Sequence, residues 1–514
     1  MDRRFNTAGP CIPEFHYMVP PLQRLPQALG LVDQMGYFVV HAPRQTGKTT
    51  ILSALAQELT ATGRYVAVHF SCELGQAVGD DYGAAQRGIL DEIRLRAELA
   101  LTPDLCPPPW PRASEATLLT VALTAWARAC PLPLVLFFDE IDALRGQSLI
   151  SVLGQLRAGY GRRPHAFPAS VVLCGLRDVR DYKAASGGDI KLESLRVRDF
   201  TPVEVAELYA QHTADTGQEF TREAVARAVE LTAGQPWLVN ALAREIVEKI
   251  AVPAAEPVTV EHVDQAKERL ILARATHLDS LAAKLAEPRV RRVIEPVIAG
   301  ALPDLDPYDD DLQYTCDLGL VAPTLPVRIA NPIYHEVIAR VLTTNVEAKV
   351  IADPRTFVLP DGRFDIDLLL REFAAFWREH ADVLMSGIVY HEVAPQLVLM
   401  GFLQRLVNGG GHVDREYGVG RGRIDLLIRW PYTTPEGKQT WQREAIEMKV
   451  WRKGKRDPLG EGLTQLDSYL DRLNLDTGAL VIFDRRPKAA PVAKRTTFAQ
   501  ATSPTGRTIT VLRA

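Results

Sequence analysis

The sequence predicts a multidomain α/β protein in which helical regions join two separate α/β units. Three observations lead to this expectation. The N-terminal third alternates short apolar runs with helical patterns, which is typical of a parallel sheet covered by helices. Residues 386–514 show a second alternation of helices and strands, after a stretch rich in Pro, Gly and Asp. The chain of 514 residues is also long enough for three or four domains, each with its own core.

The composition is that of an ordinary globular protein, with 47% hydrophobic and 24% charged residues. The six cysteines are scattered and form no CxxC pair, which favours reduced thiols in a cytoplasmic protein over a disulfide framework or a zinc site. We expect no signal peptide and no membrane contact, because no apolar run is long enough to span a bilayer. The net charge of −4 means that any contact with nucleic acid must be a local patch.

Five apolar runs in the N-terminal third predict the strands of a parallel sheet. The run before Asp139 is nearly all apolar, as expected for a strand that is buried on both faces. A helix is predicted over Thr49–Thr60, directly after the first strand. The predicted strands are Gly36–Val40, Tyr65–Phe70, Leu134–Phe138, Ser170–Gly175 and a part of Leu192–Phe200.

The loop between the first strand and its helix fits the phosphate-binding pattern G-x-x-x-x-G-K-[ST], except that Ala42 replaces the first glycine. In such a loop, backbone N–H groups at a helix N-terminus hold the β-phosphate of ATP. Lys48 would neutralise the β- and γ-phosphate charge, and the Thr49 hydroxyl would ligate Mg²⁺. The predicted ATP-binding residues of the loop are Ala42, Pro43, Arg44, Gln45, Thr46, Gly47, Lys48, Thr49 and Thr50.

Two acidic residues follow the apolar strand Leu134–Phe138. Asp139 is expected to hold Mg²⁺ through water, and Glu140 is placed to polarise an attacking water molecule. An acid-tipped strand at this distance from the phosphate loop favours an ATP site over a chance match in an unrelated α/β domain.

Residues 15 to 345 resemble the AAA-like P-loop ATPases of the additional-strand class, especially the STAND and archaeal ATPases. The resemblance implies that Arg177, in Cys174-Gly175-Leu176-Arg177, takes the sensor-1 position. It also implies that Pro236, in Gly234-Gln235-Pro236, packs near the adenine. From the residues alone, Pro236 can equally be read as a helix cap and Arg177 as a surface residue. Such ATPases often assemble, which implies a homo-oligomer. The candidates for an arginine acting in trans are Arg157, Arg162 and Arg163.

The pattern divides the chain into five parts. Residues 1–205 are expected to form the ATPase core, 206–283 a helical lid and 284–350 a winged-helix-like domain with a strand at Leu325–Ile329. Acidic residues near that strand, such as Asp311 and Asp317, favour a structural role for the winged helix over binding in a DNA groove. Residues 351–385 are expected to be a linker or helical connector, and 386–514 the second α/β domain.

In this last domain, two neighbouring strands carry residues that suit metal chemistry. Asp425 lies near the start of one strand, and Glu447 and Lys449 alternate on the next, so the latter two project from one face. If the strands pair, Asp425 joins them, and the two carboxylates can ligate Mg²⁺ or Mn²⁺. The ion would polarise a phosphodiester and activate water, while Lys449 would position that water. The predicted elements are the helix Glu392–Val407, the strands His412–Tyr417, Arg423–Trp430 and Arg443–Trp451, the helix Gly462–Leu473, and the strands Ala479–Asp484 and Thr508–Leu512.

The flanking helices add Glu392, which would complete the metal shell, and Gln465, which shares a helix face with Tyr469. This ordered set resembles the PD-(D/E)XK nuclease superfamily, with the QxxxY element of RecB-type nucleases. The resemblance covers residues 385 to 485 and implies a restriction-endonuclease-like fold. Ile424 departs from the proline that is common before the aspartate, but no metal ligand is changed.

Basic residues follow the strand of Glu447 and Lys449. Residues 440–514 contain 14 Lys and Arg against 8 Asp and Glu, an excess that would attract nucleic-acid phosphates, with Trp451 available for stacking. A solvated loop that binds no nucleic acid would have the same composition.

These features lead to the hypothesis of an ATP-binding and ATP-hydrolysing protein with a metal-dependent nuclease domain that acts on DNA. The architecture resembles prokaryotic ATPase–nuclease fusions of defence systems or mobile elements. The alternative is a nucleotide-dependent switch or scaffold whose C-terminal domain binds nucleic acid without cutting it. A translocating motor ranks last, because no helicase motif is visible. The predicted catalytic residues are Asp425, Glu447, Lys449, Gln465 and Glu140, and the predicted metal ligands are Thr49, Asp139, Glu392, Asp425 and Glu447.

Overall fold

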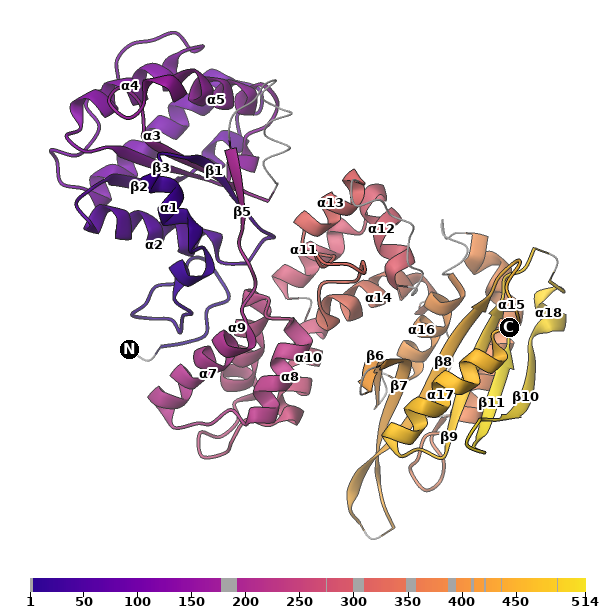
Figure 1. Cartoon of the computed structure of the whole chain (residues 1–514). Coiled ribbons are helices and arrows are strands. Elements are labelled where there is room, and N and C mark those ends of the chain that lie inside the picture. Colours follow the sequence, from indigo (N-terminus) through magenta and orange to yellow (C-terminus); the bar gives the residue numbers. More distant parts are fainter. Residues whose placement is uncertain are drawn as a thin grey trace. The chain divides into compact units, whose positions relative to one another are not determined.

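The computed structural model (Figure 1) divides into two compact units, which are described separately. The first unit comprises Met1–Ala283 and Leu305–Ile333, and the second comprises Lys284–Asp304 and Tyr334–Ala514. The structure describes residues 3–176, 192–273, 275–298, 309–347, 357–386, 394–407, 411–419, 422–435, 437–487 and 489–514.

The first unit is built on a parallel five-stranded sheet with the strand order β2-β3-β4-β1-β5. The predicted parallel sheet is confirmed. Because β4 lies between β1 and β3, one additional strand separates the strand of the phosphate loop from the strand that ends in Asp139. The strands are β1 (Tyr37–His41), β2 (Val66–Ser71), β3 (Leu134–Asp139), β4 (Ser170–Gly175) and β5 (Leu192–Arg196).

Helices cover both faces of this sheet. Alternate residues of each strand point to opposite faces, so Val39 and Phe138 pack with Trp126 while Val40 and Phe137 pack with Leu52. The first face carries α3, α4 and α5, and the second carries α1 and α2. The bounds are α1 (Gln27–Asp33), α2 (Lys48–Ala61), α3 (Tyr82–Ala100), α4 (Leu118–Ala129) and α5 (Gly146–Gly159).

A group of helices follows the sheet in the first unit. Helix α7 begins at a complete capping box, in which Thr201 and Glu204 satisfy each other's backbone N–H groups, and Thr221 caps α8. The bounds are α7 (Pro202–Thr216), α8 (Arg222–Thr232), α9 (Pro236–Arg244), a π-helical turn Glu245–Ile250, α10 (Val260–Leu272) and α11 (Thr276–Lys284).

The region predicted as a winged helix contains α12 (Pro288–Ile298), α13 (Asp310–Asp317) and α14 (Pro332–Glu347). The predicted strand at Leu325–Ile329 is wrong: the segment bends and makes one antiparallel bridge, between Val321 and Ile329. Pro326 has no N–H to give to a ladder, and the Leu325 side chain is exposed. The winged-helix identity of this region stays a prediction.

The second unit is built on a mixed six-stranded sheet with the order β10-β11-β9-β8-β7-β6. Strands β6, β7 and β8 are antiparallel, β8, β9 and β11 are parallel, and β10 pairs antiparallel with β11. The bounds are β6 (His412–Val419), β7 (Gly422–Thr433), β8 (Gln439–Trp451), β9 (Thr477–Asp484), β10 (Thr497–Thr502) and β11 (Thr508–Arg513).

Both faces of this sheet are also covered by helices. Leu466 and Leu470 of α17 pack on Leu427 and Ile482 on one face. On the other face, Trp377 of α15 contacts Phe483 of β9. The helices are α15 (Ile366–Ser386), α16 (Ala394–Val407), α17 (Leu459–Leu473) and α18 (Val492–Arg495).

Two further findings concern the whole described chain. None of its described helices is both long and apolar enough to cross a membrane. All six cysteines are free thiols, and three of them are buried.

Candidate nucleotide and metal sites

The phosphate loop connects β1 to α2 as predicted. Gly47 is the N-cap of α2 with a φ of 83°, a conformation that glycine adopts without strain. Ala42 is buried and is not among the residues with positive φ, so alanine takes the place of the first glycine without strain. The Lys48 ammonium donates to the carbonyl oxygens of Ala42 and Pro43 at 2.8 Å each. Burial lowers the pKa of Lys48.

The two predicted metal ligands of this site meet across the sheet. The Thr49 hydroxyl donates to Asp139 Oδ2 at 2.8 Å, and the Glu140 N–H donates to Asp139 Oδ1 at 2.9 Å. Burial acts to raise the pKa of Asp139, but hydrogen bonds from His69 and Thr49 outweigh it, so the pKa lies below its usual value. Asp139 is therefore a buried carboxylate that stays ionised, which suits a cation site.

Glu140 lies directly beyond the strand. Its backbone is left-handed, with a φ of 54°, and the Ser71 hydroxyl donates to its Oε2 at 2.9 Å. Burial raises the pKa of Glu140. A carboxylate with a raised pKa next to a cation site has the properties of a general base.

A pocket opens beside the phosphate loop, and several parts of the first unit line it. The loop and α2 contribute Gly47 and Thr50, α9 contributes Pro236 and Trp237, and the N-terminal segment (residues 3–20) contributes Tyr17 among others. Pro236 lines this pocket and is the first residue of α9, which agrees with its reading as a helix cap. Its place near the adenine stays a prediction. The N-terminal segment was not predicted to take part, because it carries no motif.

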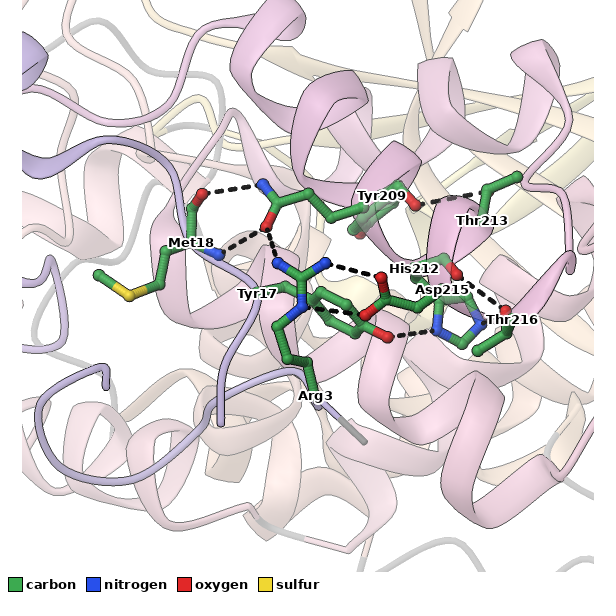
Figure 2. A network of polar contacts seen from close by, with 9 residues as sticks. Arg3, Tyr17, Met18, Tyr209, His212, Thr213, Asp215 and Thr216 are labelled. Atoms are coloured by element: carbon green, nitrogen blue, oxygen red, sulfur yellow. Dashed lines mark hydrogen bonds and ion pairs between the residues drawn. The ribbon is translucent and has the colours of Figure 1, made fainter. Parts of the chain in front are cut away.

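Figure 2 shows how the N-terminal segment is held on α7. Arg3 makes a paired ion contact with Asp215, at 2.9 and 2.7 Å. The Tyr17 hydroxyl lies 3.3 Å from His212 Nδ1, and the Gln211 side chain bonds both the N–H and the carbonyl of Met18. These contacts make α7 the anchor of one pocket wall.

Arg24 joins the phosphate loop to the helices, a role that the sequence did not reveal. Its side chain is buried, donates to Thr46 O at 2.7 Å and bonds the carbonyl of Arg198 through two of its nitrogens. Burial lowers the pKa of Arg24 to about 10. Arg198 in turn pairs with Glu204, the capping residue of α7. A chain of contacts therefore runs from the loop to α7.

A second connection runs through the Gly234-Gln235-Pro236 element. The Gln235 amide donates to Gln45 O in the phosphate loop at 3.2 Å, and its oxygen caps α9. Gly234 has a φ of 79°, and a Cβ at this position would collide with the carbonyl of Phe200.

The other predicted arginines differ in their surroundings. Arg177 lies outside the described residues. Arg163 covers the ring of Tyr160 at 3.4 Å, and Arg162 lies over Phe167 at 5.6 Å, so both pack within their own chain. Arg157 is on α5.

In the second unit, four predicted residues come together. The register of β7 and β8 pairs Leu426 with Ile446, and the Met448 N–H donates to Asp425 Oδ2 at 2.7 Å. Lys449 Nζ lies 3.0 Å from Glu447 Oε1 and 2.6 Å from Gln465 Oε1. The Gln465 amide continues to the Tyr469 hydroxyl at 3.1 Å. Glu392 lies outside the described residues.

Glu447 is the most unusual group of this cluster. It is 0% exposed, and its Oε2 has no hydrogen-bond partner among the residues that the structure describes. Burial raises the pKa of Glu447 to about 8, the charge of Asp425 adds to this, and Lys449 opposes it. A buried carboxylate oxygen without a partner is costly, and a divalent cation would satisfy it. Within the part of the chain that the structure describes, no group of three or more His, Cys, Asp or Glu side chains forms a complete metal cage.

Trp451 is less accessible than the sequence suggested. Arg486 lies 3.4 Å from the centre of its ring, and Arg513 lies at 5.7 Å. Arg486 is itself fixed by two hydrogen bonds to Asp484. The ring therefore stacks on an arginine of its own unit.

Residues 38–159, from β1 to the end of α5, match the family described as "ATPase family associated with various cellular activities (AAA)". No curated protein matches the chain.

Three solved structures are similar to this chain at low identity. The Walker-type ATPase PABY2304 of Pyrococcus abyssi is 12% identical and aligns over 65% of this chain and 99% of its own, with a TM-score of 0.48. The RuvB Holliday junction branch migration motor of Thermotoga maritima is 15% identical, over 60% of this chain and 89% of its own, with a TM-score of 0.34. The Aeropyrum pernix Orc1 protein in complex with DNA is 13% identical and aligns over 63% of this chain and 93% of its own, with a TM-score of 0.35.

Proposed function

Because the chain carries an ATPase domain of the AAA family, we propose that it hydrolyses ATP and uses this reaction to control a metal-dependent nuclease in its second unit. The proposed nuclease acts on DNA and requires Mg²⁺ or Mn²⁺. The observation that carries the nuclease part is the fully buried Glu447 carboxylate. One of its oxygens accepts from Lys449, and the other has no partner within the described part of the chain.

In the ATPase site, each residue has a role that its contacts support. Lys48 exchanges its two carbonyl partners for the β- and γ-phosphates of ATP. Thr49 and Asp139 hold Mg²⁺, which draws charge from the phosphates when it is bound. Glu140 accepts a proton from the attacking water, and the Ser71 hydroxyl orients the Glu140 carboxylate.

In the nuclease site, Asp425 and Glu447 are the proposed metal ligands. A bound divalent ion would polarise the scissile phosphate and lower the pKa of its water. Lys449 places its ammonium beside that water and offsets the charge that develops on the phosphate. Gln465, held by Tyr469, fixes the position of Lys449.

The second candidate is a nucleotide-dependent switch or scaffold whose second unit binds nucleic acid without cutting it. The contact between Lys449 and Glu447 favours this candidate, because an internal ion pair needs no metal to be satisfied. The unpartnered Glu447 Oε2 favours the nuclease.

The wider role follows from the combination of the two activities. We propose that ATP changes the assembly of the chain, as a homo-oligomer, and so exposes or pairs its nuclease units. A protein of this kind fits prokaryotic defence or mobile-element biology. The proposals on assembly and on biological role rest on the architecture alone.

The nuclease is tested by incubating the full-length protein with plasmid and linear DNA and with Mg²⁺ or Mn²⁺. Wild type should cut, and Glu447→Gln and Lys449→Ala should not. Glu444→Gln is the matched control, because it makes the same change on the same strand, three residues away and on the opposite face. Absence of cutting by wild type under every metal and nucleotide condition would favour the switch.

A further inference from the structure

The strand β2 contributes a histidine to the nucleotide site that neither its sequence context nor the phosphate-loop pattern singles out. His69 Nε2 lies 3.0 Å from Asp139 Oδ2. We propose that His69 is a positioning residue, which holds the Asp139 carboxylate in the orientation that binds the divalent cation. This inference rests on the proposed ATPase function.

The sheet places His69 for this contact. β2 pairs in parallel with β3, with Ser71 opposite Asp139 and His69 opposite Phe137. His69 and Ser71 are alternate residues, so both project from the same face of β2. Ser71 bonds Glu140 and His69 bonds Asp139, so one edge strand supplies a polar partner to each acid of the site.

Several donors fix the Asp139 carboxylate, and the Cys174 thiol of β4 is one of them. Oδ1 accepts from the Glu140 N–H at 2.9 Å, and Oδ2 accepts from the Thr49 hydroxyl at 2.8 Å and from His69. The Glu140 N–H belongs to the backbone, and Thr49 is itself a proposed ligand of the cation. Among these side chains, His69 is the ring N–H donor on the edge strand, and the proposed site needs it for no other step.

The chemistry of imidazole suits this task. The side chain is 18% exposed, against 4% for Asp139, so the bond is partly shielded from water. An imidazole N–H donates one directed hydrogen bond, which fixes the orientation of the carboxylate. Hydrogen-bond partners of metal-binding carboxylates raise metal affinity by fixing the ligand, and their loss typically weakens binding about 10- to 100-fold.

The test measures binding of a fluorescent ATP analogue to the full-length protein, first in EDTA and then during a Mg²⁺ titration. His69→Leu should raise the Mg²⁺ concentration for half-maximal enhancement of binding about ten-fold or more. Its affinity for the analogue in EDTA should equal that of wild type. His69→Gln, which keeps a neutral N–H donor, should restore most of the Mg²⁺ dependence.

The control is His165→Leu, which makes the same change at an exposed position of the same unit. Thermal unfolding in EDTA checks that each variant is folded. An unchanged Mg²⁺ dependence in His69→Leu would overturn the inference, and so would an equal loss of binding in EDTA and in Mg²⁺, because that pattern means a structural role. If wild type binds no nucleotide in either condition, the ATP site itself fails, which is a distinct result.

Discussion

Glu447 and Lys449 are alternate residues of one strand, and their charged groups meet 3.0 Å apart on a face where Glu447 has no exposed surface. The ammonium of Lys449 is thus the compensating charge that the structure gives to a carboxylate whose pKa burial raises to about 8. None of the described residues offers a hydrogen bond to the second oxygen of Glu447. This arrangement costs stability, and a costly buried charge is typical of a functional site.

The first prediction concerns the metal-free stability of this site. Folding raises the pKa of Glu447 from 4.5 to about 8, so this carboxyl costs stability at a neutral pH, where the unfolded chain would ionise it. Glu447→Gln removes this cost and keeps the shape, so in EDTA the variant should unfold at the same temperature as wild type or higher. Mn²⁺ should raise the unfolding temperature of wild type more than that of Glu447→Gln, because binding to the folded state alone stabilises it and the variant keeps only the proposed site at Asp139. Differential scanning calorimetry of both proteins checks this. An equal Mn²⁺ shift in both proteins would contradict the metal site.

The second prediction concerns Arg24, which bonds Thr46 O in the phosphate loop and the Arg198 carbonyl. Arg24→Met keeps much of the packing but leaves these buried carbonyls without their donor, at a cost of about 1–3 kcal/mol. Nucleotide affinity, measured by calorimetric titration, should fall about ten-fold or more, since about 1.4 kcal/mol is a factor of ten. Arg64→Met, at an exposed ion pair with Asp33, is the control and should bind as wild type. Equal affinities in the two variants would show that Arg24 does not support the loop.

The third prediction is a pH dependence from Glu204. Hydrogen bonds from Arg198 lower the pKa of Glu204 to about 2 from an ordinary value near 4.5, with help from the Thr201 N–H. A lowered pKa stabilises the fold above pH 4.5, and this stabilisation is lost as the pH falls from about 4.5 to about 2. Glu204→Gln should therefore cost on the order of 2 kcal/mol near neutral pH.

The difference between wild type and Glu204→Gln should shrink as the pH falls below 4.5. Urea unfolding of both proteins at several pH values, from neutral to well below 4.5, measures it. A difference that is constant over this range would mean that the charge of Glu204 does not stabilise α7.

The fourth prediction compares two glycines with nearly the same backbone. Gly234 and Gly217 have φ of 79° and 80°, but a Cβ at Gly234 would meet the Phe200 carbonyl, whereas nothing lies within 4 Å of one at Gly217. Both alanine variants carry the backbone strain of about 1–2 kcal/mol. Gly234→Ala should lose clearly more stability in urea unfolding, because of the collision. Equal losses of stability in the two variants would mean that the start of α9 can move away from Phe200 at little cost.

Much of both sites could be predicted from the sequence, because their residues follow the periodicity of the elements that carry them. Lys48 and Thr49 begin a helix after a strand, Asp139 ends a strand, and Glu447 and Lys449 alternate on one. Each of these relations spans a few residues, so the local pattern is enough.

There is a physical reason why the sequence did not reveal the other residues of the nucleotide site or two of the elements. Arg24 and His69 reach the nucleotide site from elements that do not carry its sequence motifs. His69 is a polar residue on a mostly apolar strand, and such a residue carries no spacing signal. β10 was missed because it is an exposed edge strand without the apolar alternation of a half-buried one. Leu325–Ile329 was wrongly predicted as a strand because the prediction followed its apolar residues. Pro326 has no N–H for a strand ladder, and the prediction did not take this into account.

The central claim is that one chain joins two phosphate chemistries and that the first controls the second. The most direct test is the initial rate of plasmid cleavage in Mn²⁺, with and without ATP, for wild type, Lys48→Ala and Lys449→Ala. We predict that ATP changes the rate of wild type, that Lys48→Ala cuts at a rate ATP does not alter, and that Lys449→Ala does not cut. Cleavage by wild type at one rate regardless of ATP would contradict the coupling, and cleavage by Lys449→Ala at the wild-type rate would contradict the site.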